Sequence, residues 1–211
     1  QKSLPPDHPD LATTHNNIGF VYSKMGRYSE SVSNLEKALE IREKSLPPDH
    51  PDLATTHNNI GFVYSKMGRY SESVSNLEKA LEIREKSLPP DHPDLATTHN
   101  NIGSVYSDMG RYSESLSNYE NALEIQEKSL PPDHPDLATT YENMGSVYSK
   151  MGRYTESLSH YENALEIQQK SLPPDHPDLA TAYENIKAAR VGMDRQTRVA
   201  RSKFRKSEIF N

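Results

Sequence analysis

Residues 3–44 form a unit that reads SLPPDHPDLATTHNNIGFVYSKMGRYSESVSNLEKALEIREK, and residues 45–86 repeat this unit without a change. Residues 87–128 differ from it at six places, residues 129–170 diverge further, and a partial fifth copy starts at 171. A period of about 20–50 residues indicates a fold in which copies of one supersecondary unit stack on each other. The 42-residue period therefore decides the fold class before any local pattern is considered.

The prolines mark the connectors between the repeated elements. All 15 prolines lie in the five copies of Ser-Leu-Pro-Pro-Asp-His-Pro-Asp. In the first copy, we expect Pro5 and Pro6 to hold the chain extended, while Asp7 has a side chain suited to an N-cap. Pro9 is tolerated in the first turn of a helix, where its missing N–H is not needed. The sequence thus predicts that a helix begins near Asp7 and near its equivalent in every copy.

The stretch after each connector has the spacing of two amphipathic helices. One face of the first helix carries Leu11, His15, Ile18, Tyr22 and Met25. Gly26 then suits a left-handed C-terminal cap. The second helix is predicted from about Tyr28 to Glu43, with Glu40 four residues before Lys44. Its apolar side carries Tyr28, Val32, Leu35, Ala38 and Leu39.

A helix hairpin of this kind cannot bury both of its faces alone, so neighbouring hairpins must stack. Gly19 and Ala38 are small residues within the apolar stripes, and we interpret them as points where two helices pack closely. The sequence therefore predicts an all-α fold, an α-solenoid, over residues 1–186. Residues 187–211 form a basic C-terminal capping helix or tail in this interpretation.

The segments Asn-Asn-Ile-Gly-Phe-Val-Tyr, Met-Gly-Arg-Tyr and Ala-Leu-Glu-Ile-Arg resemble a tetratricopeptide repeat, with Gly19, Tyr22 and Ala38 at the small and aromatic signature positions. The unit is longer than the usual repeat of about 34 residues. Its Leu-Pro-Pro-Asp-His-Pro-Asp-Leu-Ala connector makes it similar to the 42-residue variant of kinesin light chains and nephrocystin-3-like proteins. The resemblance covers residues 1 to about 186 and implies a right-handed α-solenoid.

Two features depart from the family pattern. Serine stands where the family often has alanine, at Ser31, Ser73, Ser115 and Ser157. Kinesin light chains also carry a heptad coiled coil that binds the motor heavy chain, and no heptads lie outside the repeats here.

A second face of the first helix repeats at Thr13, Asn17, Phe20 and Lys24, about 200° away from the packed stripe. In resembling proteins the first helices line a concave groove that holds peptides, and asparagines at the place of Asn17 bind the peptide backbone. An amide suits this role because it both donates and accepts hydrogen bonds. The resemblance thus implies peptide-binding residues at Asn17, Asn59, Asn101, Asn143 and Asn185. Alternatively, these amides cap or bridge adjacent helices inside the stack.

Positions that differ between copies would set the selectivity of this groove. The aromatic and charged positions read Phe20, Phe62, Ser104 and Ser146, and Lys24, Lys66, Asp108 and Lys150. The N-terminal end is therefore more apolar and more basic, which favours an acidic peptide with a hydrophobic or aromatic anchor. The alternative is that each Phe packs against the next first helix and that the lysines are solvated.

Nine histidines raise the question of a metal site. Five lie in the connectors and three on the packed face, and His8 and His15 lack the i, i+4 spacing of a helical zinc pair. Tyr141 at the place of His99 indicates an aromatic-sized packed slot. The chain has no cysteine, Gly-rich phosphate loop or nucleophile elbow. We therefore expect no metal, no cofactor and no catalysis.

Charge separates the end of the chain from the repeats. Residues 187–211 carry a formal charge of +6, against -6 for the whole chain. We interpret this segment as a cap on the stack; alternatives are docking on the acidic third and fourth repeats or binding an anionic partner. Because Gln1-Lys2-Ser3 matches residues 169–171, we expect the array to continue upstream.

The sequence thus favours a scaffold that binds peptide segments of other proteins. The alternative is a structural array, a spacer or an end-to-end self-assembly, because the first two repeats are identical and carry no differentiated recognition code. No apolar run is long enough to span a membrane, and membrane or nucleic-acid partners are not expected. The absence of cysteine suits a cytoplasmic location.

Overall fold

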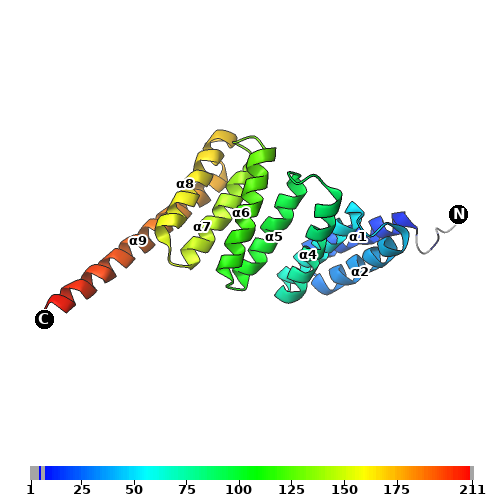
Figure 1. Cartoon of the computed structure of the whole chain (residues 1–211), viewed down its shortest axis with the longest axis horizontal. Helices are drawn as coiled ribbons and strands as arrows, with labels where there is room; N and C mark the ends of the chain where they lie inside the picture. Colours follow the sequence, from blue (N-terminus) through cyan, green and yellow to red (C-terminus); the bar gives the residue numbers. More distant parts are fainter. Residues whose placement is uncertain (1–4, 6–7, 210–211) are drawn as a thin grey trace. The chain divides into compact units, whose positions relative to one another are not determined.

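The computed structural model describes residues 5 and 8–209, and all regular structure in this part of the chain is helical (Figure 1). The first helices of the copies are α1 (Pro9–Lys24), α3 (Pro51–Lys66), α5 (Pro93–Asp108), α7 (Pro135–Lys150) and α9 (Pro177–Ile209). The second helices are α2 (Tyr28–Ser45), α4 (Tyr70–Ser87), α6 (Tyr112–Ser129) and α8 (Tyr154–Ser171). The prediction of one helix hairpin per copy is confirmed.

The chain divides into two compact units, residues 1–125 and 126–211. In the first unit, α2 packs on both α1 and α3, and α4 packs on both α3 and α5. In the second unit, α8 packs on both α7 and α9. Helices α2, α4 and α8 therefore each lie between their own first helix and the next one, which is the stacking of an α-solenoid.

Each first helix begins at the third proline of its connector, two residues later than predicted. In the second copy, the Nδ1 atom of His50 accepts a hydrogen bond from the Asp52 N–H at 3.1 Å and caps α3. The N–H of His50 donates to the Pro47 carbonyl at 3.0 Å, which closes a turn. The prediction of an extended segment with an aspartate cap is therefore wrong. The residue before a proline favours an extended backbone, and an N-cap residue also has an extended backbone. In each connector the histidine directly precedes the third proline, where the helix begins. Asp7 itself lies outside the described residues.

The hairpin turn follows the prediction. Gly68 has φ +72°, and its N–H donates to the Ser65 carbonyl at 2.9 Å. The N–H of Arg69 donates to the Tyr64 carbonyl, also at 2.9 Å. This pair of bonds is the Schellman motif, in which the left-handed residue is nearly free of strain only as glycine. The guanidinium of Arg69 also stacks 4.4 Å from the centre of the Tyr64 ring, which covers the turn.

The two helices of a hairpin cross closely at the glycine of the first helix. A Cβ atom at Gly19 would lie 2.8 Å from Cγ of Leu35. The hydroxyl of Ser31 donates to the Gly19 carbonyl at 2.7 Å, and Ala38 is fully buried. The interpretation of Gly19 and Ala38 as close-packing positions is confirmed. The bond to the glycine carbonyl also explains the buried serine, because a hydroxyl at this position finds a partner.

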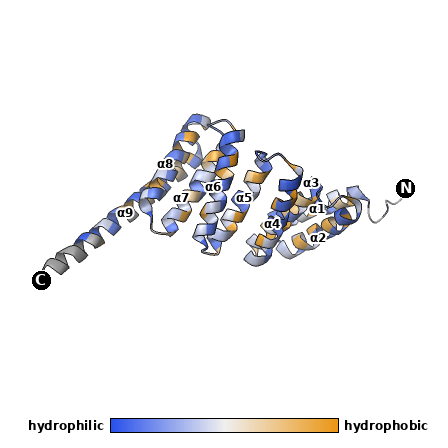
Figure 2. Cartoon of the chain, viewed as in Figure 1, coloured by the Kyte–Doolittle hydropathy of each residue, from blue (hydrophilic) through white to orange (hydrophobic). Residues whose placement is uncertain are grey.

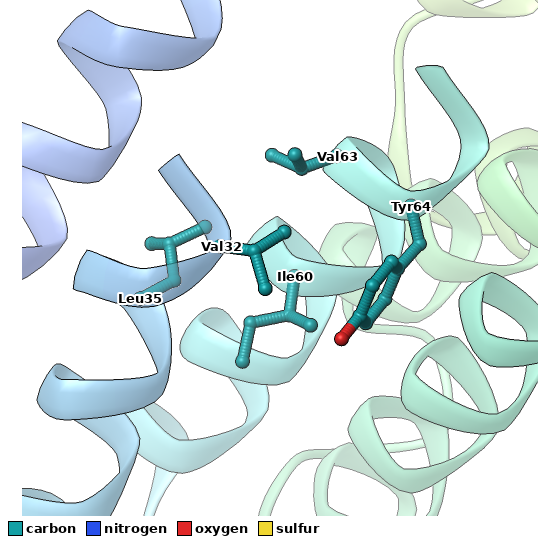
Figure 3. Packing of buried hydrophobic residues seen from close by; sticks show 5 residues of the cluster. All are labelled: Val32, Leu35, Ile60, Val63 and Tyr64. Atoms are coloured by element: carbon teal, nitrogen blue, oxygen red, sulfur yellow. The ribbon is translucent and has the colours of Figure 1, made fainter. Parts of the chain in front are cut away.

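Small apolar clusters between successive helices form the core. Figure 3 shows Val32 and Leu35 of α2 beside Ile60, Val63 and Tyr64 of α3, all buried. Apolar and hydrophilic residues alternate along the helices (Figure 2), so each hairpin buries stripes and not whole helices. The stability of the chain therefore depends on many interfaces of similar size.

In the first three copies, a buried polar contact links the second helix to the next first helix. Nη1 of Arg42 donates to the Asp52 carbonyl at 3.1 Å and to the Thr56 hydroxyl. Glutamine replaces this arginine in the third and fourth copies. The hydroxyl of Thr140 donates to Oε1 of Gln126 at 2.7 Å. These contacts fix the register between neighbouring copies.

The last helix, α9, runs without a break past the end of α8 (Figure 1). The predicted boundary between residues 186 and 187 thus falls inside a helix. Nη2 of Arg190 donates to Oε1 of Glu162 on α8 at 3.1 Å, so one tail residue contacts the fourth repeat. The side chains of Lys203, Arg205 and Lys206 lie outside the described part. Among the helices described, none combines the length and the apolar character needed to cross a membrane.

Candidate functional site

A pocket of about 210 Å³ opens between α1, α2 and α3 in the first unit. It brings together four of the residues that the sequence predicts to bind peptide: Phe20, Lys24, Asn59 and Phe62. The remaining lining consists of Ser23, Ser31, Leu35, Asn58 and Val63. We call this site the α1–α3 pocket.

The α1–α3 pocket has an apolar interior and a cationic rim. The rings of Phe20 and Phe62 are 54% and 46% exposed, so neither ring is buried in the stack. Leu35 and Val63 are almost fully buried and form the interior surface. Nζ of Lys24 lies 5.2 Å from the centre of the Phe20 ring, which places an ammonium group beside the apolar wall. Such a site can bury an apolar group that carries a negative charge nearby.

Lys66 repeats the geometry of Lys24 on the neighbouring helix. Its Nζ lies 5.2 Å from the centre of the Phe62 ring. Both lysines are exposed, as the solvated-lysine alternative also expects. Lys66 is not part of the α1–α3 pocket lining, although its aromatic partner is.

The asparagines bridge successive first helices. Nδ2 of Asn59 donates to Oδ1 of Asn16 at 3.1 Å, and Nδ2 of Asn101 donates to Oδ1 of Asn58 at 2.9 Å. The bridging role that the sequence left open is therefore present at these two positions. Each bridge uses one N–H of the donating amide, and an amide has a second N–H and a carbonyl oxygen besides. Bridging and peptide binding are thus compatible at this residue.

The other predicted positions lie outside the α1–α3 pocket. Asn17 is exposed on α1, Asn143 and Asn185 are partly exposed in the second unit, and Lys150 is exposed at the end of α7. Sequence reasoning missed the interior residues Leu35, Val63 and Ser31. The change from Leu35 to Tyr119 between copies marks this position in the sequence, but it lies on the second helix and not on the face that carries the predicted residues.

The histidines have structural partners in this fold. His50 and its equivalents cap helices, and Nδ1 of His57 lies 3.0 Å from Oδ1 of Asn76. Burial lowers the pKa of His57, and the hydrogen bond to Asn76 opposes this shift. Among the side chains that the structure describes, no three His, Asp or Glu residues are grouped as metal ligands.

A second pocket, of about 220 Å³, lies in the second unit at the connector before α7. Its lining is Glu127, Leu130, Pro132, Leu137, Tyr141 and Ile167. The hydroxyl of Tyr141 donates to Oε1 of Glu127 at 3.3 Å, and burial raises the pKa of Tyr141. None of the predicted peptide-binding residues lines this pocket.

Comparison with known families identifies the repeat. A sequence model of the tetratricopeptide repeat matches residues 10–86, 52–128, 94–154 and 136–208. The chain belongs to the tetratricopeptide repeat family. Repeats of this family generally form non-catalytic scaffolds for protein partners. No curated protein matches the sequence.

Solved structures share the tetratricopeptide repeat fold. A candidate kinesin light chain from Podosopora anserina with nearly identical TPR-like repeats has a TM-score of 0.78 at 23% identity and covers 92% of each chain. BtubC (BKLC) from P. vanneervenii has a TM-score of 0.74 at 20% identity, over 92% of this chain and 82% of its own. The apo form of RapI has a TM-score of 0.68 at 23% identity, over 77% of this chain and 57% of its own. These likenesses show that the chain has the same solenoid fold as these proteins.

Proposed function

We propose that this tetratricopeptide repeat chain is a non-enzymatic scaffold that binds a peptide segment of a partner protein, with an anchor side chain in the α1–α3 pocket. The observation that carries the proposal is the convergence of Phe20, Phe62, Lys24 and Asn59 on one pocket. The apolar interior buries a hydrophobic or aromatic side chain, and the lysines favour a neighbouring acidic residue. We assign the peptide main chain to the Asn59 amide, because an amide both donates and accepts hydrogen bonds.

The other positions of the same face extend this role along the chain. We assign the peptide backbone to the asparagines and the charge preference to the lysines; outside the α1–α3 pocket these are Asn17, Lys66, Asn101, Asn143, Lys150 and Asn185. The residues of the second unit would contact the peptide independently of the anchor. A cytoplasmic location fits a chain without cysteine.

Fluorescence offers a direct test because the chain contains no tryptophan. An acidic peptide with one tryptophan would be the only indole in the sample, and a blue shift of its emission would report burial. We expect saturable binding that Phe62→Ala weakens about tenfold, since one pocket wall is lost. Val191→Ala is the matched control, because it removes an exposed apolar side chain outside the pocket lining. Equal affinity of both variants would contradict the proposal.

A second candidate function is a structural array, because the first two copies are identical and carry no differentiated recognition code. The mass in solution over a concentration series tests this function, and a monomer at every concentration would exclude end-to-end stacking.

A further inference from the structure

Two positions on different helices change together between the copies. The first-helix position holds phenylalanine in the first two copies and serine in the next two, Ser104 and Ser146. The second-helix position holds leucine in the first two copies, Leu35 and Leu77, and tyrosine in the next two, Tyr119 and Tyr161. Phenylalanine thus always occurs with leucine, and serine with tyrosine.

Leu35 and Tyr119 occupy the same place in their hairpins. Each packs against the crossing glycine: a Cβ atom would lie 2.8 Å from Cγ of Leu35 at Gly19, and 2.8 Å from Cε1 of Tyr119 at Gly103. Leu35 lines the α1–α3 pocket from the inside. Tyr119 is therefore attached to the backbone at the position that corresponds to Leu35, which forms the interior of the α1–α3 pocket in the first copy.

The tyrosine side chain extends into the volume that the first copy leaves open. The side chains of Ser104 and Ser115, which correspond to Phe20 and Ser31, lie beside the Tyr119 hydroxyl and oppose the rise that burial causes in the pKa of Tyr119. Both of those residues line the α1–α3 pocket together with Leu35. A tyrosine ring that starts from the leucine position and reaches both Ser104 and Ser115 must therefore occupy the volume that corresponds to the α1–α3 pocket. Tyr119 is 2% exposed, so its ring lies below the surface.

The fourth copy repeats the arrangement in the second unit. Cδ1 of Tyr161 would lie 2.8 Å from a Cβ atom at Gly145, and the Ser146 side chain lies beside the Tyr161 hydroxyl, where it opposes the rise that burial causes in the pKa of Tyr161. The exchange from phenylalanine to serine makes room for the ring and also supplies a partner for its hydroxyl. A buried tyrosine needs such a partner, which explains why the two positions change as a pair.

We propose that this paired exchange determines which repeats accept an apolar anchor of a partner peptide: phenylalanine with leucine opens the site, and serine with tyrosine fills it with the protein's own ring. The inference rests on the proposed function and deepens it, because it makes Leu35 and Phe20 the residues that determine specificity. The anchor of the partner then binds at the N-terminal repeats, and the later repeats contact only the polar parts of the peptide.

Reciprocal exchanges between the copies test this inference. The closing variant Phe20→Ser, Leu35→Tyr builds the third-copy pair into the first copy, and the opening variant Ser104→Phe, Tyr119→Leu does the reverse. The probe is anilinonaphthalene sulfonate, a fluorescent dye whose fused rings fit an apolar site and whose sulfonate can pair with Lys24. We expect the closing variant to bind one dye molecule fewer than the parent chain, because the second copy keeps its own pair, Phe62 and Leu77. We expect the opening variant to gain one further site.

Val32→Leu provides the matched control, because it copies another natural difference, Leu116 of the third copy, at a position outside the pocket lining. Circular dichroism and urea unfolding establish that each variant is folded. A folded closing variant that binds the dye as the parent does would overturn the inference. So would an opening variant without an additional site.

The tryptophan peptide, titrated into the same variants, separates this inference from the proposed function. Loss of peptide binding in the closing variant, with Val32→Leu unaffected, supports both. Dye binding that follows the exchange while the peptide fails to bind the parent chain supports the paired exchange and counts against the proposed function. Peptide binding that closure leaves unchanged overturns the inference and leaves the proposed function standing.

Discussion

A Cβ atom placed on Gly61 would lie 2.7 Å from Cγ of Leu77 and 3.1 Å from the Ser73 carbonyl oxygen. The Ser73 hydroxyl donates back to the Gly61 carbonyl at 2.7 Å, so both helices are held at this separation. An added methyl group has no space unless the helices move apart. The glycine is therefore required by the crossing of two helices and not by its backbone conformation.

We predict that Gly61→Ala destabilises the chain by about 1–3 kcal/mol, the usual effect of overpacking. Urea unfolding followed by circular dichroism measures this change. Leu77→Ala should recover part of the loss in the double variant, because it removes the atoms that the methyl group meets. If the effects of the two substitutions on the free energy of unfolding are additive, contact between the added methyl group and Leu77 does not cause the loss of stability.

Ala80 tests the same crossing from the second helix. It is fully buried, so Ala80→Leu inserts three carbon atoms into a packed interface. We expect a loss of about 1–3 kcal/mol and a lower melting temperature. Ala188→Leu is the control, since Ala188 is exposed on α9. An unchanged melting temperature in Ala80→Leu would contradict the prediction.

The fold could be predicted from the sequence because its signals are local and repeated. The prolines, Gly26 and the helical spacing fixed the hairpins, and repetition required them to stack. The histidine cap was missed because both Asp7 and His8 can accept from an N–H, and only the turn closed by the connector selects between them. The residue types alone allow either the aspartate or the histidine to cap the helix. The choice depends on the turn that the connector forms in three dimensions.

The candidate site was predicted only in part. Phe20, Lys24, Asn59 and Phe62 converge because they share one face of successive first helices, and helical spacing reveals that face. Leu35 belongs to the second helix, and its approach to the pocket depends on the close crossing at Gly19. The pattern of residues along one helix does not reveal how closely the two helices of a hairpin approach each other.

Gln168 lacks a hydrogen-bond donor that its equivalent has. Thr140 donates to Oε1 of Gln126 at 2.7 Å, but the residue in the matching place for Gln168 is Ala182. Oε1 of Gln168 is buried and has no hydrogen-bond partner among the described residues. We predict that Ala182→Thr supplies the donor and stabilises the chain by about 0.5–1.5 kcal/mol. Thermal unfolding measures the gain, and Ala188→Thr controls for placing threonine on the same helix. A lower melting temperature in Ala182→Thr would contradict the prediction.

Protonation of His57 is expected to destabilise the first unit. Burial lowers the pKa of His57 below its ordinary value of 6.5. The folded chain thus binds a proton at His57 less readily than the unfolded chain does. The stability that neutral His57 contributes is fully present above about pH 6.5, the ordinary pKa of histidine. This stability is lost as the pH falls through the lower pKa of His57 in the folded chain. His57→Gln keeps an amide near Asn76 but does not titrate. We expect the urea midpoint to fall less in His57→Gln than in the parent chain between about pH 7.5 and pH 5.5. Proton NMR of the imidazole provides an independent check, and a pKa of 6.5 or higher for His57 would refute the prediction.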